Sequence, residues 1–221
     1  PAWSCYLSCI ITKTKFVTTF HGIYNFSNVF KKFYNSVMVR SNLIIAGSNY
    51  VFNHINKNYG KLINSRKRLL VIFRGINTDY FDNSNITNDK VNKVYSAVNL
   101  SSEKFKILLP GRLTRWKGQE MFIESLKILK TKFKKENFQA IILGSHQGRK
   151  VYFKKLISTV EKYDLKKQVF FIQHLSEMPV AYYVSDIIVS SSIEPEAFGR
   201  VSVEAQSMRR PIVASNHGGS R

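Results

Sequence analysis

The chain alternates short apolar runs rich in Val, Ile and Phe with longer amphipathic segments, and this alternation limits the possible folds. Strands of a parallel sheet are buried on both faces and read as continuous apolar runs, and they are usually connected by helices. From residue 105 onward the apolar runs are FKILLPG, FQAIILG, QVFFIQ, DIIVSSS and PIVAS, with helical spacing between them. The pattern predicts one doubly wound α/β domain with parallel strands.

The beginning of the chain shows the same alternation in a shorter form. The runs FVTTFHG, NLIIAGS and RLLVIFRGI predict strands, and helices are expected at 28–41 and 49–60. The apolar face expected for the first of these helices comprises Val29, Phe30, Phe33, Val37 and Met38. A second, smaller α/β unit is therefore expected before the main one.

Residues 78–104 are rich in Asn and Ser and show little apolar periodicity before a short helical segment at 91–98. We therefore expect a partial N-terminal domain at 1–77, a linker at 78–104 and a C-terminal domain at 105–221. In the first helix of the C-terminal domain, the side chains expected to face the core are Met121, Phe122, Leu126 and Leu129.

The chain carries 34 Lys and Arg against 14 Asp and Glu, a formal net charge of +20. Such a charge attracts phosphate groups, nucleic acid or anionic lipid, although lysines dispersed through an Asn-rich and Ile-rich sequence also fit a bias of composition. No helix-turn-helix, RNP-like or zinc signature accompanies the charge. A nucleic-acid-binding protein is therefore the weaker alternative, and nucleic acid is not expected among the partners.

Cys5 and Cys9 are the only cysteines, and no nearby residue completes a metal site with them. We expect two buried free thiols in a reducing compartment. No apolar run reaches the roughly 18 residues that a membrane-spanning helix needs, and the start of the chain lacks the layout of a signal peptide. These features predict a cytoplasmic protein, at most peripheral at a membrane.

Ligands of open α/β sheets bind beyond the carboxyl ends of the strands, so the residues after each apolar run matter most. After FKILLP come Gly111, Arg112 and Lys117 beside the start of a helix, where a guanidinium and an ammonium group suit a diphosphate. Taken alone, this stretch fits two solvated cations better. His146 and His174 follow the next two strands, and each is weak evidence when taken alone. No phosphate-binding loop of the G-x-x-x-x-G-K-[ST] type occurs.

The stretch SSSIEPEAFGRVSVEAQSMRRPIVASNHGG places Glu196 in a loop, Phe198 and Gly199 at a helix start, and Glu204 inside that helix. Free backbone N–H groups at the helix start could hold an anion. In the simpler interpretation, the first Glu stabilises the helix dipole and the second lies on a solvated face. In the other, both carboxylates point towards a ligand.

This acidic stretch resembles the signature of the family 4 glycosyltransferases, with two Glu separated by seven residues and Phe-Gly after the first. The segment PGRLTRWKGQ is similar to the Arg and Lys diphosphate motif of that family, and FVTTFHG, NLIIAGS and RGINTDYF resemble segments of its N-terminal half and linker. The resemblance thus extends, in the right order, over nearly the whole chain.

The resemblance implies a GT-B fold, α/β with two Rossmann-like domains and parallel sheets, the N-terminal one incomplete here. It also implies a retaining glycosyltransferase that moves a sugar from a nucleotide sugar to a glycan or lipid-linked acceptor, as in polysaccharide or lipopolysaccharide biosynthesis. No metal or other cofactor is expected. The residues implied as catalytic are His21, Arg112, Lys117 and Glu196; those implied as donor-binding are Gly111, Arg112, Lys117, His174, Glu196, Phe198, Gly199 and Glu204.

Each implied role follows the family motif. Arg112 and Lys117 would neutralise the donor diphosphate, assisted by backbone N–H groups near Phe198 and Gly199. Glu196 would hold hydroxyls of the transferred sugar and Glu204 those of the ribose. His21 would lie near the reacting centre.

The sequence also departs from the family pattern. A Gly-rich segment expected before the first strand and the final helices are missing, so we expect a fragment that needs a second chain for the absent segment. An inactive fragment or a partner subunit of the same fold is the alternative function. Arg209 stands where Gly is usual, and a left-handed residue there would cost about 1 kcal/mol. The basic N-terminal part also predicts an anionic membrane surface as a partner.

Overall fold

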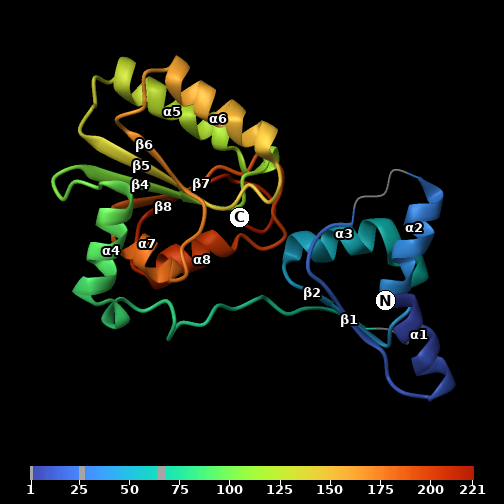
Figure 1. The fold of residues 1–221 in the computed structure, drawn as a ribbon. Coiled ribbons are helices and arrows are strands. Elements are labelled where there is room, and N and C mark those ends of the chain that lie inside the picture. The colour runs from blue at the N-terminus through green and yellow to red at the C-terminus, as the bar shows by residue number, and fades with distance from the viewer. Residues whose placement is uncertain (1, 25–27, 64–67) are drawn as a thin grey trace. The chain divides into compact units, whose positions relative to one another are not determined.

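The computed structural model describes residues 2–24, 28–63 and 68–221, which form two compact units (Figure 1). The first unit comprises Pro1–Gly75, Pro195–Gly199 and His217–Arg221, and the second comprises Ile76–Glu194 and Arg200–Asn216. Among the helices of the described residues, none is both long enough and apolar enough to cross a bilayer.

The second unit is built on a parallel sheet of five strands in the order β6-β5-β4-β7-β8. The strands are β4 Phe105–Pro110, β5 Phe138–Leu143, β6 Val169–Ile172, β7 Ile187–Ser190 and β8 Ile212–Ala214. The chain forms β4 in the middle, adds β5 and β6 on one side, and then adds β7 and β8 on the other. This is the predicted doubly wound α/β arrangement, which is confirmed.

Helices cover both faces of this sheet. The helices are α4 Asn88–Val98, α5 Gln119–Thr131, α6 Lys150–Lys162, α7 Met178–Tyr183 and α8 Arg200–Ser207. Figure 1 shows α5 and α6 on one face and α4, α7 and α8 on the other. Successive side chains of a strand point to opposite faces, so Leu109 and Ile142 pack under α5 and α6, whereas Leu108 and Ile141 pack with α7 and α8. This double burial explains the continuous apolar runs of the sequence.

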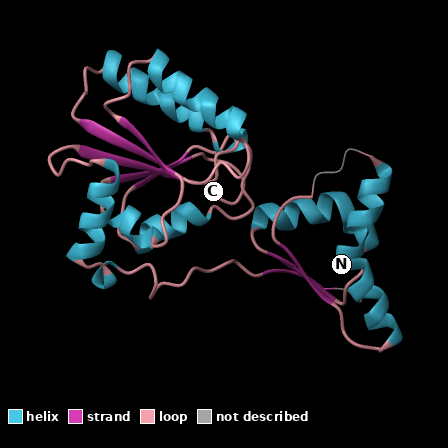
Figure 2. Cartoon of the chain, viewed as in Figure 1, coloured by secondary structure: helices cyan, strands magenta, loops and turns pink. Residues whose placement is uncertain are grey.

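The first unit contains a parallel sheet of three strands in the order β1-β2-β3, with helices before and between them (Figure 2). Its elements are α1 Ala2–Ile11, β1 Val17–Phe20, α2 Val29–Asn35, β2 Leu43–Ala46, α3 Asn49–Tyr59 and β3 Arg68–Val71. Phe20, Ile44, Val51 and Ile55 are fully buried and form its core. The predicted strands of this unit are confirmed.

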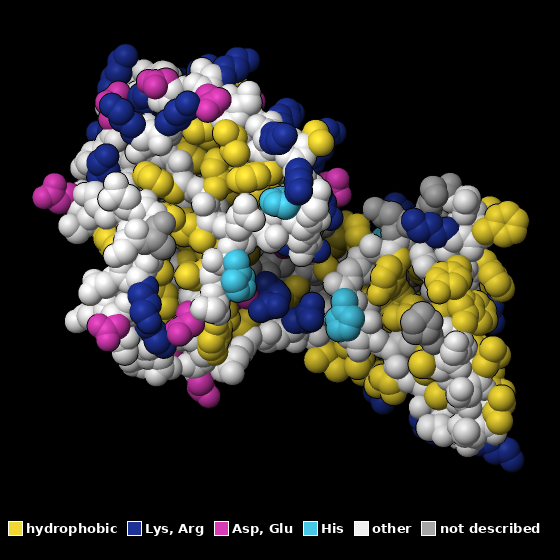
Figure 3. All heavy atoms as spheres, viewed as in Figure 1, with side chains coloured by type: hydrophobic (Ala, Val, Ile, Leu, Met, Phe, Trp, Pro, Cys, Tyr) yellow, Lys and Arg dark blue, Asp and Glu magenta, His cyan; other side chains and the backbone are white. Residues whose placement is uncertain are grey.

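The helix predicted at 28–41 is wrong in its second half. After α2 the chain tightens into a 3-10 turn, Ser36–Val39, which has three residues per turn, so the 3.6-residue spacing does not continue. Val37 and Val39 are buried, but Val29 and Phe30 are 80% and 85% exposed, so only the later part of the expected apolar face is covered. Figure 3 shows apolar side chains gathered on the visible face of this unit.

The expectation of two buried thiols is also wrong. Cys5 is exposed and Cys9 is half-buried, because α1 has no buried residue although its sequence is apolar. Both cysteines are free.

Two expectations for the second unit need revision. Met121 is 45% exposed and Ile123 is buried in its place, because the core side of α5 runs through Gln119, Phe122, Ile123 and Leu126. The segment 78–104, expected as a linker, belongs to the second unit. Its core contributions come from Phe81, Val94 and Leu100.

Candidate functional site

The loop between β4 and α5 carries Gly111, Arg112 and Lys117, three of the predicted donor-binding residues. The Arg112 side chain is exposed, and Lys117 is half-buried with its Nζ atom 4.5 Å from the centre of the Trp116 ring. The loop ends at Gly118, directly before the first residue of α5. Two cations therefore lie beside a helix N-terminus, at the carboxyl end of the middle strand, where an anion is favoured.

The segment after β7 holds this loop through its backbone. The Ser191 Oγ atom lies 3.1 Å from the carbonyl oxygens of both Lys117 and Gly118, and the Ile193 N–H donates to the Trp116 carbonyl at 2.8 Å. Gly118 has a φ of 72°, and a Cβ atom there would lie 1.9 Å from the Ser191 carbonyl oxygen. Only glycine fits this approach, so the two loops are fixed against each other.

Gln119 fixes the other end of the same loop. This side chain is fully buried, and its Nε2 atom donates to the Arg112 carbonyl at 2.9 Å. Its Oε1 atom accepts from the Tyr152 hydroxyl at 3.2 Å, and burial raises the pKa of Tyr152 to about 12. The main chain of Arg112 is thus held in place while its side chain remains exposed. Gln119 was not predicted from the sequence, although an amide on the core side of an amphipathic helix was a signal for it.

Glu204 lies on α8 and is buried, so the interpretation that placed it on a solvated face is wrong. Its Oε2 atom accepts from the Tyr182 hydroxyl at 2.7 Å, and its Oε1 atom lies 2.8 Å from Arg200 Nη2. Tyr182 on α7 was also not predicted. Its role depends on a contact with α8, and the apolar spacing within either helix does not show which residues of the two helices meet.

Glu196, Phe198 and Gly199, the other predicted residues of the acidic stretch, belong to the first unit. The backbone of Glu196 pairs with Gly218, and its carbonyl accepts from the Gly219 N–H at 2.7 Å. Gly199 has a φ of 80°, and a Cβ atom there would lie 2.9 Å from the Ser220 Cα atom. The Gly-Gly segment near the end of the chain therefore packs closely on the Phe-Gly segment.

The predicted site residues thus fall into two groups. The second unit contains Gly111, Arg112, Lys117, His174 and Glu204, and the first contains His21, Glu196, Phe198 and Gly199. Gly111, Arg112 and Lys117 lie together in the β4–α5 loop, and Glu196, Phe198 and Gly199 lie together in the segment 195–199. His174 is exposed after β6, at the same edge of the sheet but two strands from β4, and His21 is exposed directly after β1. That all nine residues serve one ligand stays a prediction.

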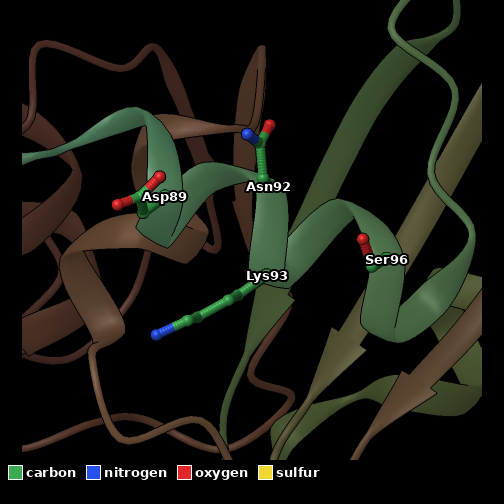
Figure 4. A pocket seen from close by; sticks show the side chains of 4 residues that line it. All are labelled: Asp89, Asn92, Lys93 and Ser96. Atoms are coloured by element: carbon green, nitrogen blue, oxygen red, sulfur yellow. The ribbon is translucent and has the colours of Figure 1, made fainter.

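A separate hollow lies on the surface of α4. Figure 4 shows that its lining side chains come from one helix: Asp89, Asn92, Lys93 and Ser96. None of the predicted site residues contributes to it, so it plays no part in the candidate site.

Comparison with known proteins places these features in a family. Residues 92–221 match the family model described as Glycosyl transferases group 1, and residues 1–80 match Glycosyltransferase Family 4. The capsular polysaccharide biosynthesis glycosyltransferase CapM of Staphylococcus aureus is 25% identical over 160 residues, which cover 70% of this chain and 39% of CapM.

Solved structures show the same fold. The crystal structure of a glycosyltransferase from Rickettsia africae ESF-5 matches with a TM-score of 0.86 and 39% identity, covering 99% of this chain and 56% of that chain. Anabaena Alr3699/HepE in complex with UDP and glucose matches with a TM-score of 0.84 and 22% identity, covering 99% and 57%. The chain therefore spans little more than half of these structures and less of CapM.

These matches confirm the predicted GT-B type of fold. One family model covers more than half of the chain and the other covers its beginning. The chain belongs to the glycosyl transferases group 1 family, with a Glycosyltransferase Family 4 segment at its start.

Proposed function

We propose that this chain binds a nucleotide sugar and takes part in retaining transfer of the sugar to a glycan or lipid-linked acceptor of the cell envelope. The β4–α5 loop carries this proposal. Its two cations lie beside a helix N-terminus, and its backbone is fixed by Gln119 and Ser191. A fixed positive site of this kind suits a diphosphate and would stabilise the charge that grows on it as the sugar leaves.

The remaining roles follow the family pattern. Glu204 would accept hydrogen bonds from the ribose, and Glu196 from the transferred sugar, with Phe198 and Gly199 supplying backbone N–H groups to the phosphates. His21 would lie near the reacting centre. The complexes of Anabaena Alr3699/HepE with UDP and with UDP-glucose support a nucleotide-sugar donor.

Direct titration tests donor binding. UDP-glucose, UDP-N-acetylglucosamine, GDP-mannose and ADP-heptose are titrated calorimetrically into the folded chain. We expect one donor to bind saturably, and Arg112→Ala to weaken it about 10- to 100-fold, since a hydrogen bond to a charged group contributes roughly 1.5–3 kcal/mol. Lys167→Ala is the matched control, because Lys167 lies just before β6, at the amino ends of the strands and away from the candidate site.

The outcomes of this titration are distinct. Binding followed by sugar transfer supports the whole proposal, whereas binding without transfer identifies a donor-binding subunit that needs a partner chain. If a folded chain binds none of the four donors, the proposed function is wrong for this polypeptide.

We also propose that the chain needs no metal ion, because Arg112, Lys117 and the start of α5 can neutralise a diphosphate themselves. Donor affinity should be the same in EDTA and in Mg²⁺. A dissociation constant that rises tenfold or more in EDTA would contradict this.

The first 75 residues favour an anionic membrane as the place of action, on its cytoplasmic side. They contain 11 Lys and Arg and no Asp or Glu, so every cation there lacks an acidic neighbour in the sequence. Apolar side chains are exposed in α1 and α2, with Ile11 82% and Phe30 85% exposed, and Lys13 and Lys31 follow them closely in the sequence. Lysines next to exposed apolar side chains suit an anionic lipid surface, which would bring the chain to a lipid-linked acceptor.

A further inference from the structure

We propose that Tyr182 is a positioning residue that orients the Glu204 carboxylate for the ribose of a bound nucleotide, an inference that rests on the proposed function. The two side chains come from different helices, α7 and α8, and meet inside the second unit. The Tyr182 hydroxyl donates to Glu204 Oε2 at 2.7 Å, and both side chains are buried.

The Tyr182 ring has little freedom to move. It is fully buried and packs edge-on against Phe81, with ring centres 5.9 Å apart and an angle of 85° between the planes. A ring fixed in this way directs its hydroxyl to one place. The hydroxyl therefore determines where Oε2 of Glu204 lies.

The direction of the hydrogen bond is also fixed. Burial, and next the charge of Glu204, raise the pKa of Tyr182 above its usual value. The phenol therefore keeps its proton at neutral pH, and Glu204 is the acceptor.

The second oxygen of Glu204 has a different partner. Arg200, one turn earlier on α8, reaches Oε1 at 2.8 Å, but the Arg200 side chain is 59% exposed whereas that of Glu204 is 10% exposed. Water therefore reaches the guanidinium end of this ion pair, while the carboxylate end is buried. Oε2 is thus held permanently from the interior, and Oε1 is the oxygen that exchanges Arg200 for a ribose hydroxyl.

The test uses nucleotides that differ only in the ribose hydroxyls. UDP, GDP and ADP, each with its 2′,3′-dideoxy counterpart, are titrated into the unaltered chain, Tyr182→Phe and the matched control Tyr183→Phe. Tyr183 is the neighbouring tyrosine, and its ring lies 5.3 Å from the Arg210 guanidinium, a contact that phenylalanine keeps. We expect Tyr182→Phe to weaken the nucleotide that binds about tenfold and to leave its dideoxy form unchanged. The control should change neither affinity.

Two results would overturn the positioning role. Equal weakening of both forms means that Tyr182 only supports the fold, and equal affinity of Tyr182→Phe and the unaltered chain means that the hydroxyl is not used.

A second measurement separates this proposal from the proposed function. Urea unfolding of Tyr182→Phe, Glu204→Gln and the double variant gives the coupling between the two side chains without any nucleotide. No coupling removes the basis of the positioning role even if nucleotides bind. Clear coupling in a chain that binds no nucleotide contradicts the proposed function and, with it, the assignment of Glu204 to a ribose.

Discussion

Two buried tyrosine hydroxyls hold polar side chains of the candidate site. Tyr152 donates to Gln119, which in turn fixes the Arg112 carbonyl, and Tyr182 donates to Glu204. A neutral phenol suits this task because it satisfies a buried acceptor without adding a charge.

The chain should lose stability at alkaline pH through these tyrosines. Burial raises the pKa of Tyr152 from 10.0 to about 12. Because the unfolded tyrosine ionises first, the stabilisation is complete below about pH 10 and is lost as the pH rises towards 12. Tyr152→Phe should flatten this loss in urea unfolding measured across that range. Tyr80→Phe, at a tyrosine 44% exposed, is the control, and an equal flattening there would contradict the assignment.

Arg209 carries backbone strain at the end of α8. Its φ is 52°. This confirms the left-handed conformation expected at this position, where glycine is usual and this chain has Arg209. Arg209→Gly should raise the free energy of unfolding by about 0.5–1 kcal/mol, because glycine adopts this conformation without a Cβ clash. Arg209→Ala, which removes the side chain but keeps the strain, should gain nothing in the same urea titration. An equal gain in both variants would assign the effect to the charge instead.

Individual site residues were predictable to different degrees. Arg112 and Lys117 come after an apolar strand, where parallel sheets bind ligands, but this position alone also fits two solvated cations. Their assignment to a diphosphate came from the family resemblance and stays a prediction. Gln119 and Tyr182 act through residues that are distant in the sequence, and a helical period shows only which side of a helix is buried. What lies across that buried side depends on packing.

At the scale of elements, the candidate site depends on two loops that follow neighbouring strands. The loop after β4 and the segment after β7 touch backbone to backbone at Gly118 and Ser191, because β4 and β7 pair in the sheet. The backbone that carries the Lys117 side chain is therefore held by a segment distant in the sequence.

Gly118→Ala should destabilise the second unit by several kcal/mol and abolish donor binding. The methyl group would have to displace the Ser191 backbone, whereas strain from φ alone costs roughly 1–2 kcal/mol. Gly148→Ala is the matched control, since Gly148 has a φ of 82° and nothing within 4 Å of its added Cβ atom. Equal losses in thermal unfolding of the two variants would show that the contact with Ser191 contributes nothing.

Most elements were predictable because strands buried on both faces leave continuous apolar runs. The second half of the helix predicted at 28–41 was not, because a 3-10 turn and an α-helix place apolar residues at nearly the same spacing over one turn. The segment 78–104 was expected as a linker because its few apolar residues are far apart in the sequence. Phe81, Val94 and Leu100 meet only in the folded core.

For the whole molecule, charge is distributed unequally along the sequence. All 14 acidic residues come after position 75, whereas 11 of the 34 cations come before it. Two units could be predicted from the alternation. The assignment of the short segments Pro195–Gly199 and His217–Arg221 to the first unit could not, because loop contacts leave no periodic signal.

Binding to vesicles that contain phosphatidylglycerol should depend on the start of the chain. Replacing Lys13, Lys15, Lys31 and Lys32 by Gln should remove roughly 4 kcal/mol of binding free energy at low salt, at about 1 kcal/mol for each lysine near the surface. The control variant replaces Lys132, Lys134, Lys135 and Lys154 by Gln and changes the net charge equally. Equal weakening of both variants in vesicle sedimentation would mean that only the total charge matters.

The strand order of the second unit also determines how its sheet can form during synthesis. Each strand after β4 pairs with one that has already been made, but the second edge of β4 waits for β7. At ~5–20 residues per second, the ribosome needs roughly 4–15 s to travel from Pro110 to Ile187. During those seconds one side of β4 has no partner strand and can pair with other nascent chains. We expect chaperones to bind the chain at this stage. The strand whose arrival ends this exposure, β7, thus leads directly into the segment that fixes the cationic loop.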